Sequence, residues 1–411
     1  MFSTLYSAKI LSKVMRFATK HFLDLKLTKL VLPKAPDKKA RLLYIHIPFC
    51  HTLCPYCSFH KFPFDEKSAL SYFELLHQEI HLVHQLGYKF DSIYFGGGTT
   101  TILPQKLLET IQFVKSLFDI KEISCESDPL HIADINAPKF YKEINRLSIG
   151  IQSFNDEYLI QMGRHHKFGS AQEQFDKVKA ALNDFSIVNI DIIYNYPNQS
   201  EAQINEEIDQ VLKLRPKQVT FYPLMYAPNI QYHLSKEWGK LNDEKEQKFY
   251  EIIQERMNKV YTQRSSWAWS LDEDDIIDEY VIERNEYVGV GSGAFSFIGN
   301  TLYANTFSLS KYAELLKQGK LPITHAVSFS KRSIAEYRMI TELFGLHSSS
   351  KHPKIEQLLL KLLGVYNKQG KVSQKGNYLM SVMMREFYNG MDYIRETMRS
   401  TLSKRDETIA P

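Results

Sequence analysis

The chain has 411 residues, of which 44% are apolar and 24% are charged, an ordinary mixture for a protein that buries a large core. Its 51 lysines and arginines nearly balance its 47 acidic residues, and this balance argues against a nucleic-acid partner. No stretch has the 18 or more apolar residues needed to cross a bilayer, and four cysteines are too few for a disulfide scaffold of this length. We therefore expect a cytoplasmic protein.

Residues 1–40 form a basic N-terminal extension. They hold nine lysines and arginines against two acidic residues, and apolar residues recur at helical spacing between Leu5 and Leu27. Such an amphipathic helix can lie at the inner face of a membrane, with its lysines against anionic head groups. It can equally pack on the rest of the protein. Both alternatives stay open, and Pro33 and Pro36 mark the linker that follows.

From residue 41 onward, β-rich runs alternate with helical segments. The β-rich runs are 42–47, 92–95, 122–125, 146–151, 187–193 and 218–222. The helical segments between them include 66–85, 105–117, 171–184 and 201–213. Six βα units predict an α/β fold with a partial (βα)6 TIM-like barrel, whose reactive groups lie at the C-terminal ends of the strands. We assign residues 41–305 to this barrel and residues 306–411 to a small, mostly helical C-terminal domain.

Three cysteines follow the first predicted strand within eight residues. Cys50, Cys54 and Cys57 are separated by three and then two residues, and no second cysteine cluster is found in the chain. Three thiolates on one loop can hold three irons of a [4Fe–4S] cluster and leave the fourth iron free for an exogenous ligand. The alternative is a zinc site with three cysteines, in which His51 or His60 supplies the fourth ligand.

Further motifs follow this loop in order. They are GGGT at 96–99, an acidic strand end at Glu126, SIGIQSF at 148–154, an Arg-His pair at 164–165, DIIY at 191–194 and a glycine-rich segment at 289–299. With YIHIPFC at 44–50, this series resembles the radical S-adenosylmethionine enzymes. More narrowly, it resembles the branch of oxygen-independent coproporphyrinogen III oxidases, which also includes haem chaperones and radical methyltransferases. The resemblance covers residues 41 to 390.

The resemblance implies cofactors and the residues that bind them. The cysteines would hold a [4Fe–4S] cluster, and two molecules of S-adenosylmethionine (SAM) would bind beside it. The first SAM would contact Tyr44, Gly97 and Glu126. The second would contact Tyr56, Gly98, Thr99, Gln152, Arg164 and Asp191, with Ala227 and Phe295 as weaker contacts. A reduced ferredoxin or flavodoxin would donate the electron.

Catalytic residues are harder to assign from the sequence. His165 and His166 follow Arg164 directly and could serve as bases, although surface positions are an equal alternative. The resemblance assigns no other general acid or base.

Three departures from the branch bear on the substrate. The oxidases have a Gly-Cys-Asn segment where this chain has Ser58-Phe59-His60, and the haem chaperones have a histidine that is missing from 284–288. The third departure is the 40-residue extension. Together they favour a class C radical methyltransferase that methylates the menaquinone ring at position 8. The alternative is an oxygen-independent coproporphyrinogen III oxidase, which carries out an oxidative decarboxylation in haem biosynthesis, or a related haem chaperone or haem-degrading protein. The small-molecule substrate would be a quinone or a tetrapyrrole.

Overall fold

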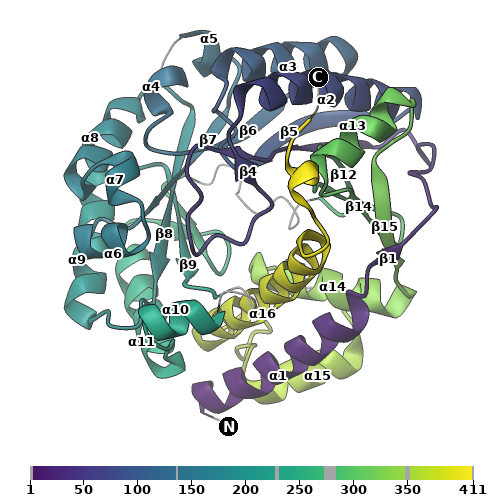
Figure 1. Cartoon of the computed structure of the whole chain (residues 1–411). Coiled ribbons are helices and arrows are strands. Elements are labelled where there is room, and N and C mark those ends of the chain that lie inside the picture. The colour runs from purple at the N-terminus through teal and green to yellow at the C-terminus, as the bar shows by residue number, and fades with distance from the viewer. Residues whose placement is uncertain (1–2, 136–137, 227–230, 273–283, 348–351, 410–411) are drawn as a thin grey trace.

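One large mixed sheet organises the protein. In the computed structural model, which describes residues 3–135, 138–226, 231–272, 284–347 and 352–409, this sheet has 13 strands. Their order is β1-β15-β14-β13-β12-β2-β5-β6-β7-β8-β9-β11-β10. Figure 1 shows the sheet curving around a central space, with most helices on its outside.

The six predicted strands form the middle of the sheet and pair in chain order, all parallel. They are β2 (Ala40–Ile47), β5 (Lys89–Gly97), β6 (Glu122–Ser127), β7 (Arg146–Gln152), β8 (Ile187–Tyr194) and β9 (Gln218–Pro223). Their β-branched and leucine side chains, such as Ile45, Leu147 and Ile190, are fully buried. The predicted partial barrel is therefore confirmed, since buried parallel strands need apolar side chains on both faces.

Helices connect these strands, and the longer ones cover their outer face. They are α2 (Glu66–Gln85), α3 (Pro104–Leu117), α4 (Ile132–Ile135), α5 (Pro138–Tyr141), α6 (Asp156–Gln161), α7 (His165–Phe168), α8 (Ala171–Ala181), α9 (Glu201–Leu214), α10 (Gln231–Glu237) and α11 (Asp243–Met257). The local sequence explains their starts. In α9, for example, Ser200 and Gln203 form a capping box, and Ile204, Ile208 and Val211 face the core at helical spacing.

Further strands extend both ends of the parallel sheet. β12 (Tyr287–Val290) adds a seventh parallel strand beside β2. Antiparallel strands then follow: β13 (Phe295–Ile298), β14 (Thr301–Asn305), β15 (Ile323–Ser328) and β1 (Lys26–Leu27) on this side, and β11 (Ala268–Ser270) and β10 (Thr262–Gln263) beside β9. A separate small sheet joins β3 (Phe49–Cys50) to β4 (Phe62–Pro63). The sequence prediction did not include these additions.

The C-terminal part is mostly helical, as predicted. It contains α13 (Leu309–Lys317), α14 (Lys331–Phe344), α15 (Lys354–Leu363), α16 (Gln374–Arg399) and a 3₁₀ helix (Lys404–Glu407). α16 crosses the open side of the barrel, and the chain then returns toward α2 (Figure 1). One consequence is that side chains of α16 face the C-terminal ends of the parallel strands.

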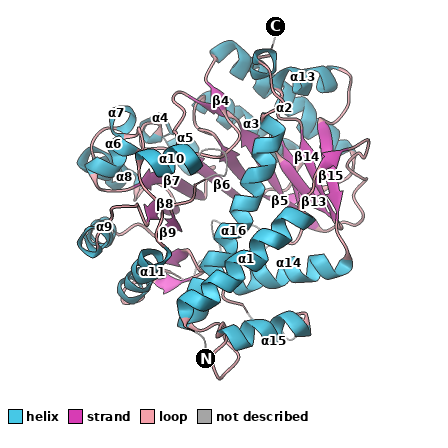
Figure 2. Cartoon of the chain, turned by 60° about the horizontal axis from the view of Figure 1, so that its bottom comes forward, coloured by secondary structure: helices cyan, strands magenta, loops and turns pink. Residues whose placement is uncertain are grey.

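The N-terminal extension forms one helix, α1 (Thr4–Phe22), which lies against α16 (Figure 2). Its inner side buries Ser7, Leu11, Met15 and Thr19. The approach is close, because a Cβ atom on Gly390 of α16 would lie 2.6 Å from the Cβ of Thr19. One face of the predicted amphipathic helix therefore packs on the protein. No helix within the described residues is long and apolar enough to span a membrane.

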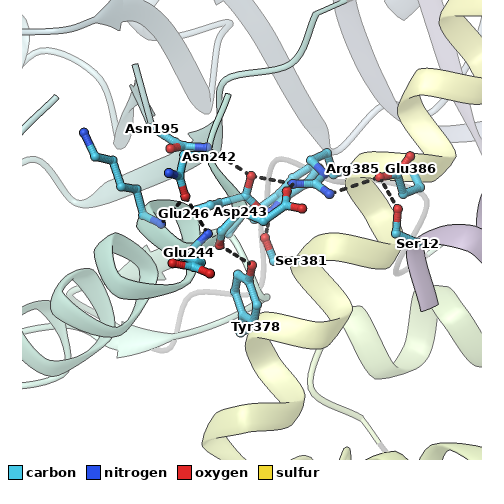
Figure 3. A network of polar contacts seen from close by, with 12 residues as sticks. Ser12, Asn195, Asn242, Asp243, Glu244, Glu246, Tyr378, Ser381, Arg385 and Glu386 are labelled. Atoms are coloured by element: carbon cyan, nitrogen blue, oxygen red, sulfur yellow. Dashed lines mark hydrogen bonds and ion pairs between the residues drawn. The ribbon is translucent and has the colours of Figure 1, made fainter. Parts of the chain in front are cut away.

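A buried network of charges joins α1, α11 and α16 (Figure 3). Arg385 lies between two carboxylates, with Nη1 2.5 Å from Glu246 Oε2 and Nη2 3.0 Å from Glu386 Oε1. Glu386, with 1% of its side chain exposed, also accepts hydrogen bonds from Arg16 Nε and Ser12 Oγ, both at 2.8 Å. Buried charges must be paired, so this network fixes how α1 sits on α16.

Candidate active site

A cavity of about 520 Å³ lies at the C-terminal ends of the parallel strands. It brings together the three cysteines and almost all residues that the sequence predicts for SAM binding. These are Tyr44, Cys50, Cys54, Tyr56, Cys57, Gly97, Gly98, Thr99, Glu126, Gln152, Arg164, Asp191 and Phe295. They come from separate strands and loops, so the fold gathers them as parallel strands of a barrel gather their ends.

The cysteine loop begins directly after β2 and is held at both ends. Backbone bonds from Phe62 N to Pro48 O (2.6 Å) and from Phe64 N to Cys50 O (2.9 Å) close it. Inside the loop, Lys61 Nζ donates to the carbonyl oxygen of Cys57 at 2.6 Å. The segment that differs from the oxidases is part of this closure, because Arg399 of α16 donates to the carbonyl oxygens of residues 58 and 59.

The donor set of three thiols on one loop fits an iron–sulfur cluster, in which each thiolate holds one iron. Cys50 is buried, and both burial and the nearby Cys57 raise its pKa to about 11, so a thiolate there needs a cationic metal centre. Within the described residues, no group of three or more His, Cys, Asp or Glu side chains converges as the ligands of one ion do. A cluster of several irons is instead held by thiolates that bind different irons.

The two histidines considered as zinc ligands lie among aromatic rings. The ring of His51 stacks on His131, with 5.5 Å between the ring centroids, and its edge meets Phe64. His60 is 2% exposed and its ring centroid lies 4.2 Å from that of Phe307. Both rings are therefore packed in aromatic surroundings, although Nδ1 of His60 is buried and has no hydrogen-bond partner among the described residues.

The glycine motif packs on the cysteine loop. Gly98 N donates to Ile47 O at 2.8 Å, and Thr99 N donates to Phe49 O at 2.7 Å. A Cβ atom on Gly98 would lie 2.5 Å from Phe49 O, which leaves no room for a side chain. The family resemblance assigns Gly97 and Gly98 to contacts with SAM. For Gly98, the structure gives a separate reason for glycine, the close approach of the loop that carries Cys50.

The residues predicted for the first SAM lie together. Glu126 accepts hydrogen bonds from Gly97 N at 3.1 Å and from Tyr94 OH at 2.9 Å. Tyr44 is close to it, since the Cβ position of Gly96 is 3.1 Å from both Tyr44 OH and Glu126 Oε1. Burial and the charge of Glu126 raise the pKa of Tyr44, so its phenol stays protonated. This corner therefore offers one carboxylate and one phenol to a polar ligand.

Arg164 supplies a positive charge next to the cysteine loop. Its guanidinium is bonded to the carbonyl oxygen of Gly150, lies 3.4 Å from Tyr56 OH and 4.0 Å from Cys54 Sγ, and stacks on Phe168. Arg164 is 5% exposed, and its Nε atom has no hydrogen-bond partner in the described part of the chain. A carboxylate is the natural ligand for such a group.

Gln152 is the last residue of β7, and Asp191 lies on the neighbouring strand β8. Gln152 has a φ of +75° and lies at a bulge in the pairing of β7 with β8. A bulge redirects a side chain at the end of a strand, and a left-handed residue other than glycine at such a place is a mark of a functional site. Asp191 accepts a hydrogen bond from Asn189 Nδ2 at 2.9 Å and from Ser148 Oγ at 3.3 Å.

The remaining predicted residues are placed differently. Phe295 lines the cavity, whereas Ala227 lies outside the described residues. His165 and His166 do not line the cavity. His165 Nε2 lies 3.7 Å from Asp156 Oδ1, and His166 is exposed to solvent. The structure thus gives no support for these histidines as bases that act on a molecule in the cavity.

Sequence reasoning missed several residues of the cavity. His46 shares a face of β2 with Tyr44, and its Nδ1 lies 2.8 Å from Tyr44 OH. Burial lowers the pKa of His46 to about 4, so the imidazole is neutral. The alternation of side chains along a strand could have placed His46 beside Tyr44.

A second omission is an apolar arm of the cavity, which runs from the cysteine end between α1, α14 and α16. Its lining includes Phe22, Phe329, Tyr337, Ile340, Met384 and Phe387. Charged groups that line it form ion pairs, Glu336 with Arg332 at 2.8 Å and Asp392 with Arg395 at 2.6 Å. No motif signals this arm, because its walls come from opposite ends of the chain.

Comparisons with known proteins agree with this arrangement. The model of the radical SAM superfamily matches residues 44–211. A haem chaperone of Bacillus subtilis is 29% identical, with 69% of this chain and 79% of that protein covered. An oxygen-independent coproporphyrinogen III oxidase of Helicobacter pylori is 26% identical over 74% of this chain and 72% of its own length.

A solved structure supports the fold. Coproporphyrinogen III oxidase of Escherichia coli, described as a radical SAM enzyme, matches with a TM-score of 0.68 and 22% identity over 86% of this chain and 91% of that chain. These similarities do not support the menaquinone methyltransferase subtype that the sequence departures favoured, and they agree better with the alternative. Over residues 44–211 the chain matches the radical SAM superfamily, and over 69–74% of its length it is similar to haem chaperones and coproporphyrinogen III oxidases.

Proposed function

We propose that the protein holds a [4Fe–4S] cluster through Cys50, Cys54 and Cys57 and uses SAM to start a radical reaction on a flat ring molecule. The observation that carries this proposal is the convergence of the three thiols, Arg164 and Glu126 on one cavity. A tetrapyrrole is the first candidate substrate, because the relatives are named for haem and for coproporphyrinogen.

The polar residues have distinct parts in this proposal. When bound, the cluster and SAM supply a carbon radical that can abstract a hydrogen atom from the substrate. Arg164 binds a carboxylate of SAM through its fork of N–H donors. Asp191 pairs with an ammonium group, and Glu126 accepts hydrogen bonds from ribose hydroxyls or from an ammonium. Two SAM molecules and a ferredoxin or flavodoxin as electron donor remain part of the proposal.

The apolar arm has two effects on the reaction. It excludes water from the polar end of the cavity, which strengthens the charge interactions there. It also offers aromatic surface to a planar ring, through Tyr337 and Phe387 for example.

The same arm favours methylation of the menaquinone ring as a second candidate. A tetrapyrrole with carboxylate side chains needs cations around it, whereas Arg395 is already paired with Asp392. The other lysines and arginines that line the cavity within the described residues, Lys61, Arg164 and Lys167, lie on or beside the cysteine loop. A quinone with an isoprenoid chain has no such requirement.

The test uses the full chain, with its cluster reconstituted without oxygen and with dithionite as the reductant. SAM consumption is followed with coproporphyrinogen III or with menaquinone, and the products are identified by mass spectrometry. We expect SAM cleavage that depends on one of these substrates. A decarboxylated porphyrinogen supports the first candidate, and a quinone heavier by one methylene group supports the second.

Two cysteine variants control this experiment. Cys54→Ala should abolish cluster formation and SAM cleavage. Cys125→Ala is the matched control, because Cys125 is a buried residue of β6 and does not line the cavity. Equal activity of wild type and Cys54→Ala would refute the radical reaction. Stoichiometric haem binding without SAM cleavage would indicate a carrier protein instead. In cells that lack the gene, extraction of porphyrins and quinones shows which pool changes.

A further inference from the structure

α15 carries an exposed apolar stripe. Ile355, Leu358 and Leu362 are 70%, 60% and 59% exposed, and Leu359 is partly exposed beside them. Positions i, i+3, i+4 and i+7 share one face of a helix, so these side chains form a continuous strip. The opposite side of α15 is also apolar, and it buries Leu360 and Leu363 in the core. α15 therefore has two apolar sides: one packs in the core, and the other is exposed to solvent.

α1 also has an apolar side in the core and a second apolar side that is exposed. Its inner side packs on α16, yet Tyr6, Val14 and Phe17 are 53%, 45% and 74% exposed on its outer side, with Ile10 half-buried between them. These positions again follow helical spacing. Single exposed apolar residues need no explanation, but two neighbouring helices with outer apolar stripes do.

Lysines flank both stripes. Lys9, Lys13 and Lys20 are exposed on α1, which contains no acidic residue. On α15, Lys354 and Lys361 are exposed, and the single acid Glu356 is paired with Arg332.

The two helices lie side by side at the same end of the molecule in both views (Figures 1 and 2). Ser7 Oγ of α1 donates to Leu363 O of α15 at 3.0 Å, so the pair is directly linked. The apolar arm of the cavity reaches the C-terminal end of α1. Phe22, which is 40% exposed, lines both the arm and an adjoining surface groove that also includes His21 and Lys26.

We propose that the outer faces of α1 and α15 form a docking surface for an anionic lipid bilayer. Apolar side chains rimmed by lysines match the boundary between acyl chains and anionic head groups. A second copy of this chain is a poorer occupant, because a symmetric dimer would bring the two sets of lysines together. The proposal goes beyond the proposed function, and it offers an apolar substrate a short path from the bilayer to the cavity.

Co-sedimentation with lipid vesicles tests the proposal without any catalytic readout, so its failure is distinct from failure of the proposed reaction. The full chain is mixed with vesicles of phosphatidylcholine alone or of phosphatidylcholine with phosphatidylglycerol. We expect binding to the anionic vesicles that weakens with salt. The double variant Ile355→Glu/Leu358→Glu should bind at least about tenfold more weakly, since each glutamate removes apolar contact and repels the head groups. Lys9→Glu/Lys13→Glu should weaken binding to anionic vesicles by about tenfold.

Ile160→Glu is the matched control, because Ile160 is 63% exposed on α6, far from α15 in Figure 1. It should bind vesicles as the wild type does. The proposal is overturned if wild type shows no binding to anionic vesicles, or if the α15 variant binds equally well. It is also overturned if, without lipid, wild type is a dimer by analytical ultracentrifugation and the α15 variant is a monomer, because the surface then serves a second copy.

Discussion

The guanidinium of Arg164 lies 4.0 Å from the Sγ of Cys54, in the wall of the cavity where the cysteine loop meets the end of β7. The same group contacts Tyr56 OH and the carbonyl oxygen of Gly150. A thiolate at Cys54 would thus have a fixed cation beside it. The planar fork of arginine makes these contacts together, and an ammonium group cannot.

We therefore predict that Arg164→Lys lowers kcat/KM for SAM cleavage by about 10- to 100-fold, because a charged hydrogen bond in a buried site is lost. Iron content and melting temperature should stay close to those of wild type, since the charge is retained. Steady-state kinetics with an iron assay checks both. Wild-type kcat/KM in this variant would remove Arg164 from the proposed binding site.

A second prediction concerns the contact between the glycine motif and the cysteine loop. Gly98→Ala would place a Cβ atom 2.5 Å from Phe49 O. We expect a loss of about 1–3 kcal/mol in the free energy of unfolding, because backbone must move. Iron content after reconstitution should fall as well, because Phe49 directly precedes Cys50.

The control for this variant is Gly319→Ala, which has a positive φ of +68° but nothing within 4 Å of the Cβ position. Gly319→Ala should cost about 1–2 kcal/mol through backbone strain, yet leave iron content unchanged. If Gly98→Ala reconstitutes a full cluster, the glycine motif does not set the position of Cys50.

Local patterns explain why the parallel strands could be predicted. Each combines buried apolar residues with a neighbouring polar helical segment, and this signal does not depend on distant parts of the chain. The site residues Glu126 and Asp191 followed from the family resemblance, and Glu126 also from its place at the end of a predicted strand. The cavity confirms that they meet, although what they bind remains a prediction.

The added strands and the apolar arm could not be predicted, because they depend on contacts between segments that are distant in sequence. The glycine-rich run at 289–299 was used only as a motif of the family, whereas the structure shows that it includes the end of β12, the whole of β13 and the turn between them. The apolar arm needs Phe22 from α1 and Met384 from α16, which are 362 positions apart in sequence. No local sequence pattern predicts this contact, because the two residues come together only when α16 crosses the barrel.

A third prediction concerns the buried carboxyl group of Glu79. It accepts hydrogen bonds from Tyr312 OH at 2.6 Å, Gly291 N at 2.7 Å and Asn305 Nδ2 at 2.7 Å, yet burial raises its pKa to about 7 from the ordinary value of 4.5. The unfolded chain releases this proton at a lower pH than the native state does. Glu79 therefore makes the protein less stable as the pH rises from about 4.5 to about 7, by up to about 3 kcal/mol.

Glu79→Gln should remove this pH-dependent part of the free energy of unfolding. The free energy of unfolding of the variant, minus that of wild type, should rise across this pH window and level off above it. Urea unfolding at several pH values measures the difference, and Glu74→Gln at an exposed position of α2 is the control. A difference that does not change with pH would show that Glu79 does not titrate in this range.

The last prediction concerns Glu386, which anchors α1. Its carboxylate is nearly fully buried and binds Arg385, Arg16 and Ser12. Glu386→Ala would leave Arg385 with one carboxylate partner fewer in a buried place, and removal of one member of a buried pair costs about 3–5 kcal/mol. We expect a loss of this size in the free energy of unfolding, measured in urea.

The same variant should also loosen α1, because Arg16 and Ser12 lose their contact with α16. Limited proteolysis within residues 4–22 should become faster before the protein unfolds as a whole. Glu314→Ala provides the comparison, since its ion pair with Lys311 is also 2.8 Å long but exposed. Exposed pairs contribute about 0–1 kcal/mol, so this variant should unfold like wild type. If both variants lose the same stability, burial does not give the Glu386 network its strength, and α1 is held mainly by its apolar face.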